Sequence, residues 1–275
     1  MAAKVVLLAY TPCPEQTVAM AAKLCYSKSD IETVKEGLTE EKTASFLDML
    51  SSLGHQSPIE HASFTFGIEG ISRACSHQLV RHRMASYSQQ SQRYVDGSSF
   101  EYVTPPSIAE NPEILEKYNK ALDIESKAYV EVRNALIAGS IKKYLTNIEH
   151  SFGDISEKSE DAIISEFYDF DKKKFSEFEK RANEDARFIL PNACTTKIIC
   201  TFNARSLMNF FEHRCCNRAQ WEIRDVAQQM LLLVKDAAPH IFKKAGPACL
   251  YGTCPEGKMS CGRAKEMREK FGVNL

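Results

Sequence analysis

The chain has 275 residues, of which 44% are hydrophobic and 26% are charged, so it can form one large domain or two small ones with a sizeable core. This composition excludes the disordered, collagen-like and low-complexity classes of protein. The formal net charge of -1 argues against a general polyanion binder, so any positive field has to be local.

The amino-terminal segment predicts no targeting signal. Its apolar run, residues 5–9, is too short for the core of a signal peptide, and no later segment approaches the roughly 20 apolar residues of a membrane span. We therefore expect a cytoplasmic protein with no membrane partner. In such a protein, the ten cysteines are expected to be thiols rather than a disulfide framework.

Five of these cysteines are grouped. Cys215 and Cys216 are adjacent, and Cys249, Cys254 and Cys261 lie in a tail rich in Gly and Cys. The tail spacing C-x4-C-x6-C lacks the two-residue gap of common zinc sites. The sequence therefore predicts ordinary thiols and no bound metal.

Strand and helix patterns alternate in the first part of the chain. Residues 4–10, KVVLLAY, predict a strand, and residues 14–27 predict a helix. Thr39 is a suitable cap for a second helix, which Gly54 can terminate. Residues 63–70 alternate Phe and Ile with small or polar residues, so they predict a strand with an aromatic core face.

The next elements are helices. Helical spacing places one set of side chains on a common face, namely Ile71, Ala74, Cys75, Gln78, Leu79 and His82. Residues 71–82 therefore predict a helix, and a basic segment begins near its end. Asn111 is a cap and Pro112 a first residue for a long helix that we expect to end by Gly139. Residues 140–180 are densely charged and predict a surface excursion, partly helical, rather than a site.

The last part of the chain returns to regular patterns. Residues 195–202 predict a strand, a helix is expected from Asn203, and residues 219–236 predict another helix. From Gly246 onwards, the pattern is typical of a loop followed by a short helix.

Residues 71–95 contain no Asp or Glu but carry four arginines and two histidines. In a chain of balanced charge, such a segment indicates a local anion site. Alternatively, Arg81, His82 and Arg83 only stabilise a helix C-terminus, an effect of about 1 kcal/mol or less. That alternative does not explain the hydrogen-bonding side chains that follow, which are Ser86, Ser88, Gln89, Gln90, Ser91 and Arg93.

A second stretch of interest is TFNARSLMNFFEHRCCNRAQWE. Helical spacing puts Leu207, Phe210 and Arg214 on one face, so an arginine ends an apolar stripe. Alternatively, Arg214 is a surface residue, and the aliphatic part of its side chain covers the edge of the core. Arg205 and Asn209 add a polar edge to the same helix.

A third stretch, HQSPIEH at residues 55–61, holds two histidines, each of which is more often structural when considered alone. The nucleotide motifs G-x-G-x-x-G and G-x-x-x-x-G-K are missing from the sequence, so arginines rather than a glycine cradle would have to hold phosphates. G-x-S-x-G and H-E-x-x-H are missing as well, which leaves acyl transfer and zinc hydrolysis without their usual motifs.

These three stretches resemble the flavin-dependent thymidylate synthase family. One segment is similar to the family's signature: it consists of Arg81-His82-Arg83, seven further residues and then Ser91. The similarity extends to GHQSPIEHASFTF upstream and to NARSLMNFFEHR and AQWEIRDVA downstream, in the family's order. The excursion after Gly139 and the Cys-rich tail have no counterpart in that pattern.

The resemblance implies an α/β (α+β) fold, with a single-domain subunit whose central mixed or antiparallel sheet is flanked by helices. It also implies a cytoplasmic homotetramer with active sites between subunits. We assign residues 1–248 to the family domain, with the excursion at about 140–180, and residues 249–275 to the tail. The implied reaction is the reductive methylation of dUMP to dTMP, in which methylenetetrahydrofolate gives the carbon, FAD carries the hydride and NADPH restores the flavin.

The resemblance also implies the site residues. Those implied for FAD are Ser57, Arg81, His82, Arg83, Gln89, Asn203, Arg205 and Asn209. Those implied for dUMP are Gln78, Arg81, Gln89, Ser91, Arg93, Arg187 and Arg214. Arg214 is the implied catalytic residue, which activates uracil, and His55 is a plausible neighbour of the folate. Guanidinium groups and hydroxyls can donate hydrogen bonds to the oxygens of a nucleotide phosphate. This chemistry agrees with the roles implied for Arg93, Arg187 and Ser91.

The chain departs from the family pattern at Ser88-Gln89, where the family commonly has Asn-Glu. Gln89 keeps the hydrogen-bonding reach but cannot be an anion or a base, so we expect it to bind and not to transfer a proton. An unrelated thymidylate synthase uses the cysteine of a Pro-Cys-His-Gln run. That run is missing here, so we expect no catalytic cysteine.

Three other interpretations compete with the enzyme. A module that binds nucleic acid or phosphoproteins would lose affinity steeply with salt, but the near-zero net charge argues against a nucleic-acid partner. A flavoprotein of other chemistry, such as an NADPH oxidase, would not need Arg187 and Arg214, and tight dUMP binding would distinguish it. A purely structural role for the basic segment leaves three matching stretches unexplained.

Overall fold

The computed structural model describes residues 3–95, 97, 101–147, 152–155 and 157–273. It divides into two compact units, each of which is described by itself. Unit 1 comprises residues 1–89 and 196–275, and unit 2 comprises residues 90–195. The tail is grouped with unit 1 in this division, and the domain boundary at residue 248 remains a prediction.

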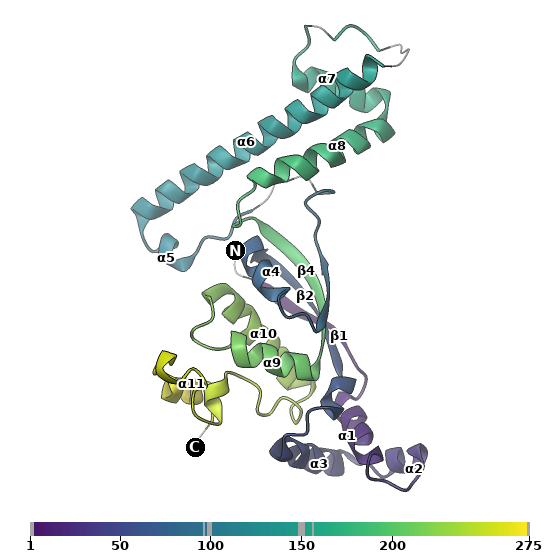
Figure 1. Ribbon diagram of the computed structural model, residues 1–275, viewed down its shortest axis with the longest axis vertical. Coiled ribbons are helices and arrows are strands. Elements are labelled where there is room, and N and C mark those ends of the chain that lie inside the picture. Colours follow the sequence, from purple (N-terminus) through teal and green to yellow (C-terminus); the bar gives the residue numbers. More distant parts are fainter. Residues whose placement is uncertain (1–2, 96, 98–100, 148–151, 156, 274–275) are drawn as a thin grey trace. The chain divides into compact units, whose positions relative to one another are not determined.

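Unit 1 is built on a four-stranded sheet with the strand order β1-β2-β4-β3 (Figure 1). β1 (Lys4–Tyr10) pairs antiparallel with β2 (Ser63–Ser72), and β3 (Ala85–Gln89) pairs antiparallel with β4 (Thr195–Asn203). The strands predicted at residues 4–10, 63–70 and 195–202 are confirmed, whereas the short β3 was not predicted. The predicted combination of a central sheet with helices is also confirmed.

The period-two pattern of β2 produces the core face of the sheet. Phe64 and Phe66 are fully buried and Ile68 is 2% exposed, whereas the residues between them are only partly buried. The remaining strands and helices contribute to one apolar core that includes Phe202 of β4. Alternating burial along a strand is expected when one face of the sheet packs on a core.

The early helices follow their sequence signals, with one boundary shifted. α3 (Glu40–Leu53) begins at Thr39, whose hydroxyl accepts the Lys42 N–H, and ends at Gly54, which has a positive φ of 72°. α1 (Pro14–Leu24) ends earlier than predicted and buries Val18. The short helices α2 (Ile31–Glu36) and η1 (Pro58–His61) complete this part of the chain.

Two further helices lead to the site. α9 (Ala204–Arg214) begins directly after its cap Asn203, one residue past the predicted start, and α10 (Trp221–Ala237) starts two residues later than predicted because Gln220 caps it. α4 (Arg73–Leu79) is capped by Ser72 and ends before Arg81, so it is shorter than the helix predicted over residues 71–82. After α10, the tail forms η4 (Ala248–Leu250), η5 (Gly257–Met259) and α11 (Ala264–Lys270), which confirms a loop followed by a short helix.

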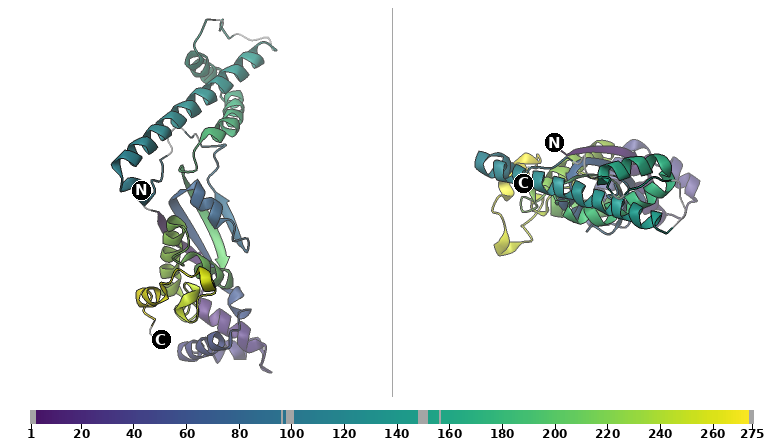
Figure 2. Two further views of the ribbon diagram at one scale, coloured as in Figure 1. Left: turned by 60° about the vertical axis from the view of Figure 1, so that its left-hand side comes forward. Right: turned by 90° about the horizontal axis from the view of Figure 1, so that it is seen from above.

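Unit 2 is helical. It contains α5 (Pro106–Ala109), α6 (Pro112–Leu145), α7 (Glu160–Phe170), α8 (Lys172–Ala186) and η3 (Arg187–Ile189). α8 lies alongside α6 in both Figure 1 and Figure 2. The Asn111 cap of α6 is confirmed, since its side chain accepts the N–H groups of Glu113 and Ile114.

Two predictions for this unit are wrong. α6 does not end by Gly139 but continues to Leu145, because Ile141 and Leu145 extend its buried face and a glycine inside a helix costs only about 1 kcal/mol. The segment at residues 140–180 is also more than a surface excursion. Its aromatic residues form a core with α6, whose buried members are Ile137, Ile141, Leu145, Ile163, Phe167, Phe175, Phe178 and Ala182.

Among the residues described, no helix combines the length and the apolar character that crossing a membrane requires.

Candidate functional site

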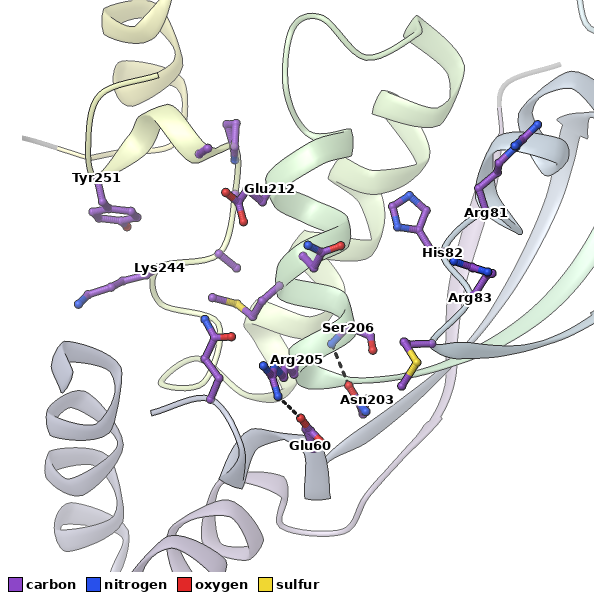
Figure 3. Close-up of a pocket in the computed structure, with 18 residues that line it drawn as sticks. Glu60, Arg81, His82, Arg83, Asn203, Arg205, Ser206, Glu212, Lys244 and Tyr251 are labelled. Carbon is purple, nitrogen blue, oxygen red and sulfur yellow. Dashed lines mark hydrogen bonds and ion pairs between the residues drawn. The ribbon is translucent and has the colours of Figure 1, made fainter. Parts of the chain in front are cut away.

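A cavity of about 690 Å³ in unit 1 brings together four segments that are distant in sequence. Its walls come from the stretch that holds Gln56 and η1, from the turn after α4, from α9, and from the segment that leads from α10 into η4 (Figure 3). Six of the eight residues expected to bind flavin line it: Arg81, His82, Arg83, Asn203, Arg205 and Asn209.

The turn after α4 is held by Tyr87 of β3. Its hydroxyl lies 2.9 Å from the carbonyl oxygen of Leu79 and 2.8 Å from that of His82, so it can donate to either of the two. Because this turn is held from inside the unit, the exposed Arg81 and Arg83 stand at the cavity wall together with His82 (Figure 3).

α9 forms the central wall. Leu207, Phe210 and Phe211 are fully buried, which anchors the helix and leaves its polar edge facing the cavity. Asn203 caps the helix by accepting the Ser206 N–H at 2.8 Å. The Arg205 guanidinium forms an ion pair with Glu60 of η1.

His82 and Arg214 form a polar contact between the turn and the end of α9. Arg214 Nε donates to His82 Nε2 at 3.0 Å, and the imidazole also packs edge-to-face on Phe210. Burial, followed by the nearby Arg214 charge, lowers the pKa of His82 to about 4. His82 is therefore neutral at physiological pH, and its Nε2 is a free acceptor for Arg214.

A second cavity, of about 420 Å³, adjoins the first because both are lined by His82 and Asn209. Arg214 lines this second cavity. Its opposite wall is the tail, which contributes Cys249, Cys254 and Cys261.

Three residues expected in the site lie in unit 1 but line neither cavity: Ser57, Gln78 and Gln89. Ser57 lies between Gln56 and Glu60, which do line the larger cavity. Gln89 is held by buried hydroxyls, since its Nε2 donates to Ser76 Oγ at 2.9 Å and to Thr196 Oγ1 at 3.3 Å.

The other residues expected to bind dUMP belong to unit 2, where they form one cluster. Arg93 Nη2 lies 3.0 Å from a carboxylate oxygen of Glu184, and Arg187 Nε donates to the main-chain carbonyl of Glu184 at 3.1 Å. Ser91 Oγ accepts the Arg93 N–H at 3.1 Å. Arg93 Nε is buried and has no hydrogen-bond partner among the described residues. Glu184 therefore holds both guanidinium groups, one through its side chain and one through its main chain, and guanidinium groups and hydroxyls are the donors that a phosphate site requires.

Sequence reasoning missed several residues of the larger cavity. These are Gln56, Glu60, Met84, Ser206, Met208, Glu212, the segment 244–248 that leads into the tail, and Tyr251. Glu60 lies in the HQSPIEH stretch, but its pairing with Arg205 joins positions 145 residues apart, for which the sequence has no local signal. Figure 3 shows Lys244 and Tyr251 on the side of the cavity opposite to Arg81.

The larger cavity has the chemistry of a nucleotide site. Arg81, Arg83, Arg205 and Lys244 outnumber the two acids, Glu60 and Glu212, so the local field favours a phosphate. The amides of Asn203 and Asn209 can donate to and accept from the edge of a heteroaromatic ring. These groups fit a flavin dinucleotide, which carries both features.

The sequence model of the family described as "Thymidylate synthase complementing protein" matches residues 6–240. The chain is 51% identical to the flavin-dependent thymidylate synthase of Clostridium tetani over 271 residues, covering 98% of each protein. It is 47% identical to that of Geobacter sulfurreducens, covering 98% of this chain and 97% of the relative. It is 38% identical to that of Pyrococcus furiosus, covering 98% and 96%.

These alignments correct one expectation about the relatives. The excursion after Gly139 and the tail were expected to have no counterpart. Because the match to the Clostridium tetani protein covers 98% of both chains, both segments fall largely within it. The similarity to the relatives therefore extends over more of the chain than the motifs alone indicated.

Proposed function

Because this chain belongs to the flavin-dependent thymidylate synthase family, we propose that it is an enzyme that reductively methylates dUMP to dTMP. Methylenetetrahydrofolate is the proposed carbon donor, and NADPH is the proposed reductant. The larger cavity is the proposed site of FAD, which when bound supplies the hydride that completes the methyl group.

The observation that carries this proposal is the contact between Arg214 and His82. Among the described residues, Arg214 has no carboxylate partner, and the imidazole that orients it is neutral. The guanidinium is therefore held in place while its charge stays available. Arg205 differs in this respect, because its charge is compensated by Glu60.

Such a cation is what the reaction needs at uracil. Carbon C5 of uracil is a poor nucleophile until electron density reaches it, and a positive charge at the N3 and carbonyl edge favours the ionised, enolate-like ring. The partly buried position of Arg214 strengthens its field relative to that of an arginine in water. We therefore assign the activation of dUMP to Arg214.

The binding roles are proposed as follows. Arg93, Arg187 and Ser91 hold the dUMP phosphate, and Glu184 orients the two guanidinium groups before the substrate arrives. The remaining dUMP contacts are Gln78, Arg81 and Gln89. The flavin contacts are Ser57, Arg81, His82, Arg83, Gln89, Asn203, Arg205 and Asn209.

A cysteine nucleophile is not part of the proposal. Burial raises the pKa of Cys200 and of Cys215 to about 12, so these thiols stay protonated and unreactive. If a Cys→Ala variant at any one position lost turnover while its folding and flavin binding stayed intact, this part of the proposal would be wrong.

Cytoplasmic location, assembly as a homotetramer with sites between subunits, and the lack of a nucleic-acid partner belong to the same proposal. The near-zero net charge supports the last of these.

The reaction itself is tested with the flavin spectrum. The holoenzyme is reduced under anaerobic conditions, and dUMP and methylenetetrahydrofolate are added separately and then together. We expect reoxidation of the flavin and formation of dTMP only when both are present. If the two substrates have no effect and the flavin is reoxidised only when oxygen is admitted afterwards, a simple oxidase would be favoured. A chain that binds no flavin would refute the proposal.

A further inference from the structure

Four cysteines of unit 1 line the smaller cavity. Cys216 follows α9, and Cys249, Cys254 and Cys261 lie on the tail. All four are free thiols. The sequence spacing alone argued against a metal site, but it could not show that Cys216, 33 positions before Cys249, lies beside the tail.

We propose that Cys216, Cys249, Cys254 and Cys261 bind one soft metal ion, with Zn²⁺ as the expected occupant, and that this ion fixes the tail to the body of unit 1. Four thiolates are a common ligand set of structural zinc sites, which need no open position for a substrate. Arg214 lines the same cavity, so the test of this proposal measures metal content rather than activity.

Positive charge lies beside the four cysteines. Arg218 lines the same cavity and would face the negative charge of the thiolates that a bound metal ion requires.

The tail has little else to hold its fold. Its own core consists of Cys249, Leu250 and Met267, and its one α-helix has seven residues. Arg268 ties the segment together by donating to the carbonyls of Cys249, Leu250 and Gly252. A segment with so small a core commonly needs a metal or a disulfide to be stable.

Among the described residues, no three His, Cys, Asp or Glu side chains are already arranged as a metal site. The thiols therefore have to turn inward on binding. The loop that carries Cys254 and Cys261 can allow this, because it is partly exposed and contains Gly257 and Gly262, both with positive φ.

The test starts with the full chain, purified under reducing conditions without chelators. Zinc, iron and acid-labile sulfide are measured per chain, so that a zinc ion and an iron-sulfur cluster, which share thiolate ligands, are distinguished. We expect about one zinc per chain in the wild type. The double variant Cys254→Ser/Cys261→Ser should lose it, and the matched variant Cys13→Ser/Cys25→Ser, which changes two exposed cysteines outside the cavity, should keep it.

A second measurement covers the case in which the double variant does not fold. Co²⁺ is added to metal-free wild-type chain, and the ligand-field absorption in the red, beyond that of oxidised flavin, is recorded. Intense bands typical of tetrahedral thiolate coordination would support the site, and iron with sulfide would support it with a different occupant. Wild-type chain that carries no metal and binds neither Zn²⁺ nor Co²⁺ would refute the proposal, as would equal metal content in both double variants.

Discussion

Arg214 in unit 1 and Arg93 in unit 2 are held by opposite kinds of partner. Arg214 is oriented by a neutral imidazole, whereas Arg93 pairs with the carboxylate of Glu184. A neutral acceptor orients the guanidinium group without compensating its charge. A carboxylate does compensate the charge, until a stronger anion replaces the carboxylate. The first arrangement suits a group that acts on a developing charge, and the second suits a group that exchanges one anion for another.

Replacement of Arg214 tests the first half of this comparison and should have the largest effect. Removing a charged donor aimed at developing charge typically lowers the rate by about 10² to 10³-fold. We expect Arg214→Gln to lower the single-turnover rate of dTMP formation by such a factor while the flavin spectrum stays unchanged. Arg214→Lys should recover part of the rate, because it restores the charge but not the Nε–H that bonds to His82.

The matched control for Arg214 is Arg224→Gln. Arg224 lies on α10, lines neither cavity, and donates to the carbonyl of Asn217. Its replacement should leave the rate nearly unchanged. A wild-type rate in Arg214→Gln would remove Arg214 from the chemistry.

Replacement of Arg93 tests the second half. Because Arg93 is assigned to ground-state binding of phosphate, Arg93→Gln should raise KM for dUMP by about 10 to 100-fold, the usual cost of a lost charged hydrogen bond, with a smaller change in kcat. Steady-state kinetics at varied dUMP measures both values. Arg181→Gln, an exposed position on the same helix as Glu184, is the control.

A fall in kcat with an unchanged KM for the Arg93 variant would contradict the comparison. It would mean that an arginine paired with a carboxylate still acts in the chemical step, and the distinction between the two kinds of partner would fail.

The parts of the fold that depend on local sequence pattern could be predicted from the sequence. The alternation of Phe64 and Phe66, the caps at Thr39 and Asn111, and the buried face of the helix after Asn203 each depend on neighbours within a few residues. The family motifs then directed attention to the cavity residues. In both cases the information lies within a short window of the chain.

The partners of the functional residues were not predictable in the same way. His82 and Arg214 are 132 residues apart, and the Arg205–Glu60 pair spans 145. The end of α6 was misplaced because Gly139 is a weak helix breaker when residues beyond it are buried. The approach of Cys216 to the tail cysteines likewise depends on tertiary packing. Which partner each charge has, and so whether it is compensated, is decided by the fold.

The neutrality of His82 is tested by the pH dependence of stability. The unfolded histidine takes up its proton near pH 6.5, but the folded one resists protonation until about pH 4, so stability is complete above pH 6.5 and decreases as the pH falls towards 4. Between these values, the wild type should lose about 1 to 2 kcal/mol more unfolding free energy than His82→Gln, given the partial exposure of the ring.

Urea unfolding of both proteins at pH 7 and pH 4.5 measures this difference. Glutamine is a suitable control because its carbonyl can still accept from Arg214 but does not titrate. Identical losses in the two proteins would mean that His82 is not the group that resists protonation, and Arg214 would then need another explanation for its uncompensated charge.

Gln89 should show the smallest effect, because its amide is already held by two hydroxyls of the protein. Its Nε2 donates to Ser76 and Thr196, and both of these also bond to Arg73, through its carbonyl and its guanidinium respectively. We expect Gln89→Ala to weaken the affinity for dUMP or flavin by about 3 to 10-fold, the usual range for one neutral hydrogen bond. Equilibrium titration with each ligand measures this, and Gln229→Ala, which removes an amide with two hydrogen bonds on α10, is the control. Unchanged affinities for both ligands would make Gln89 a structural support of β3 and would remove it from the site.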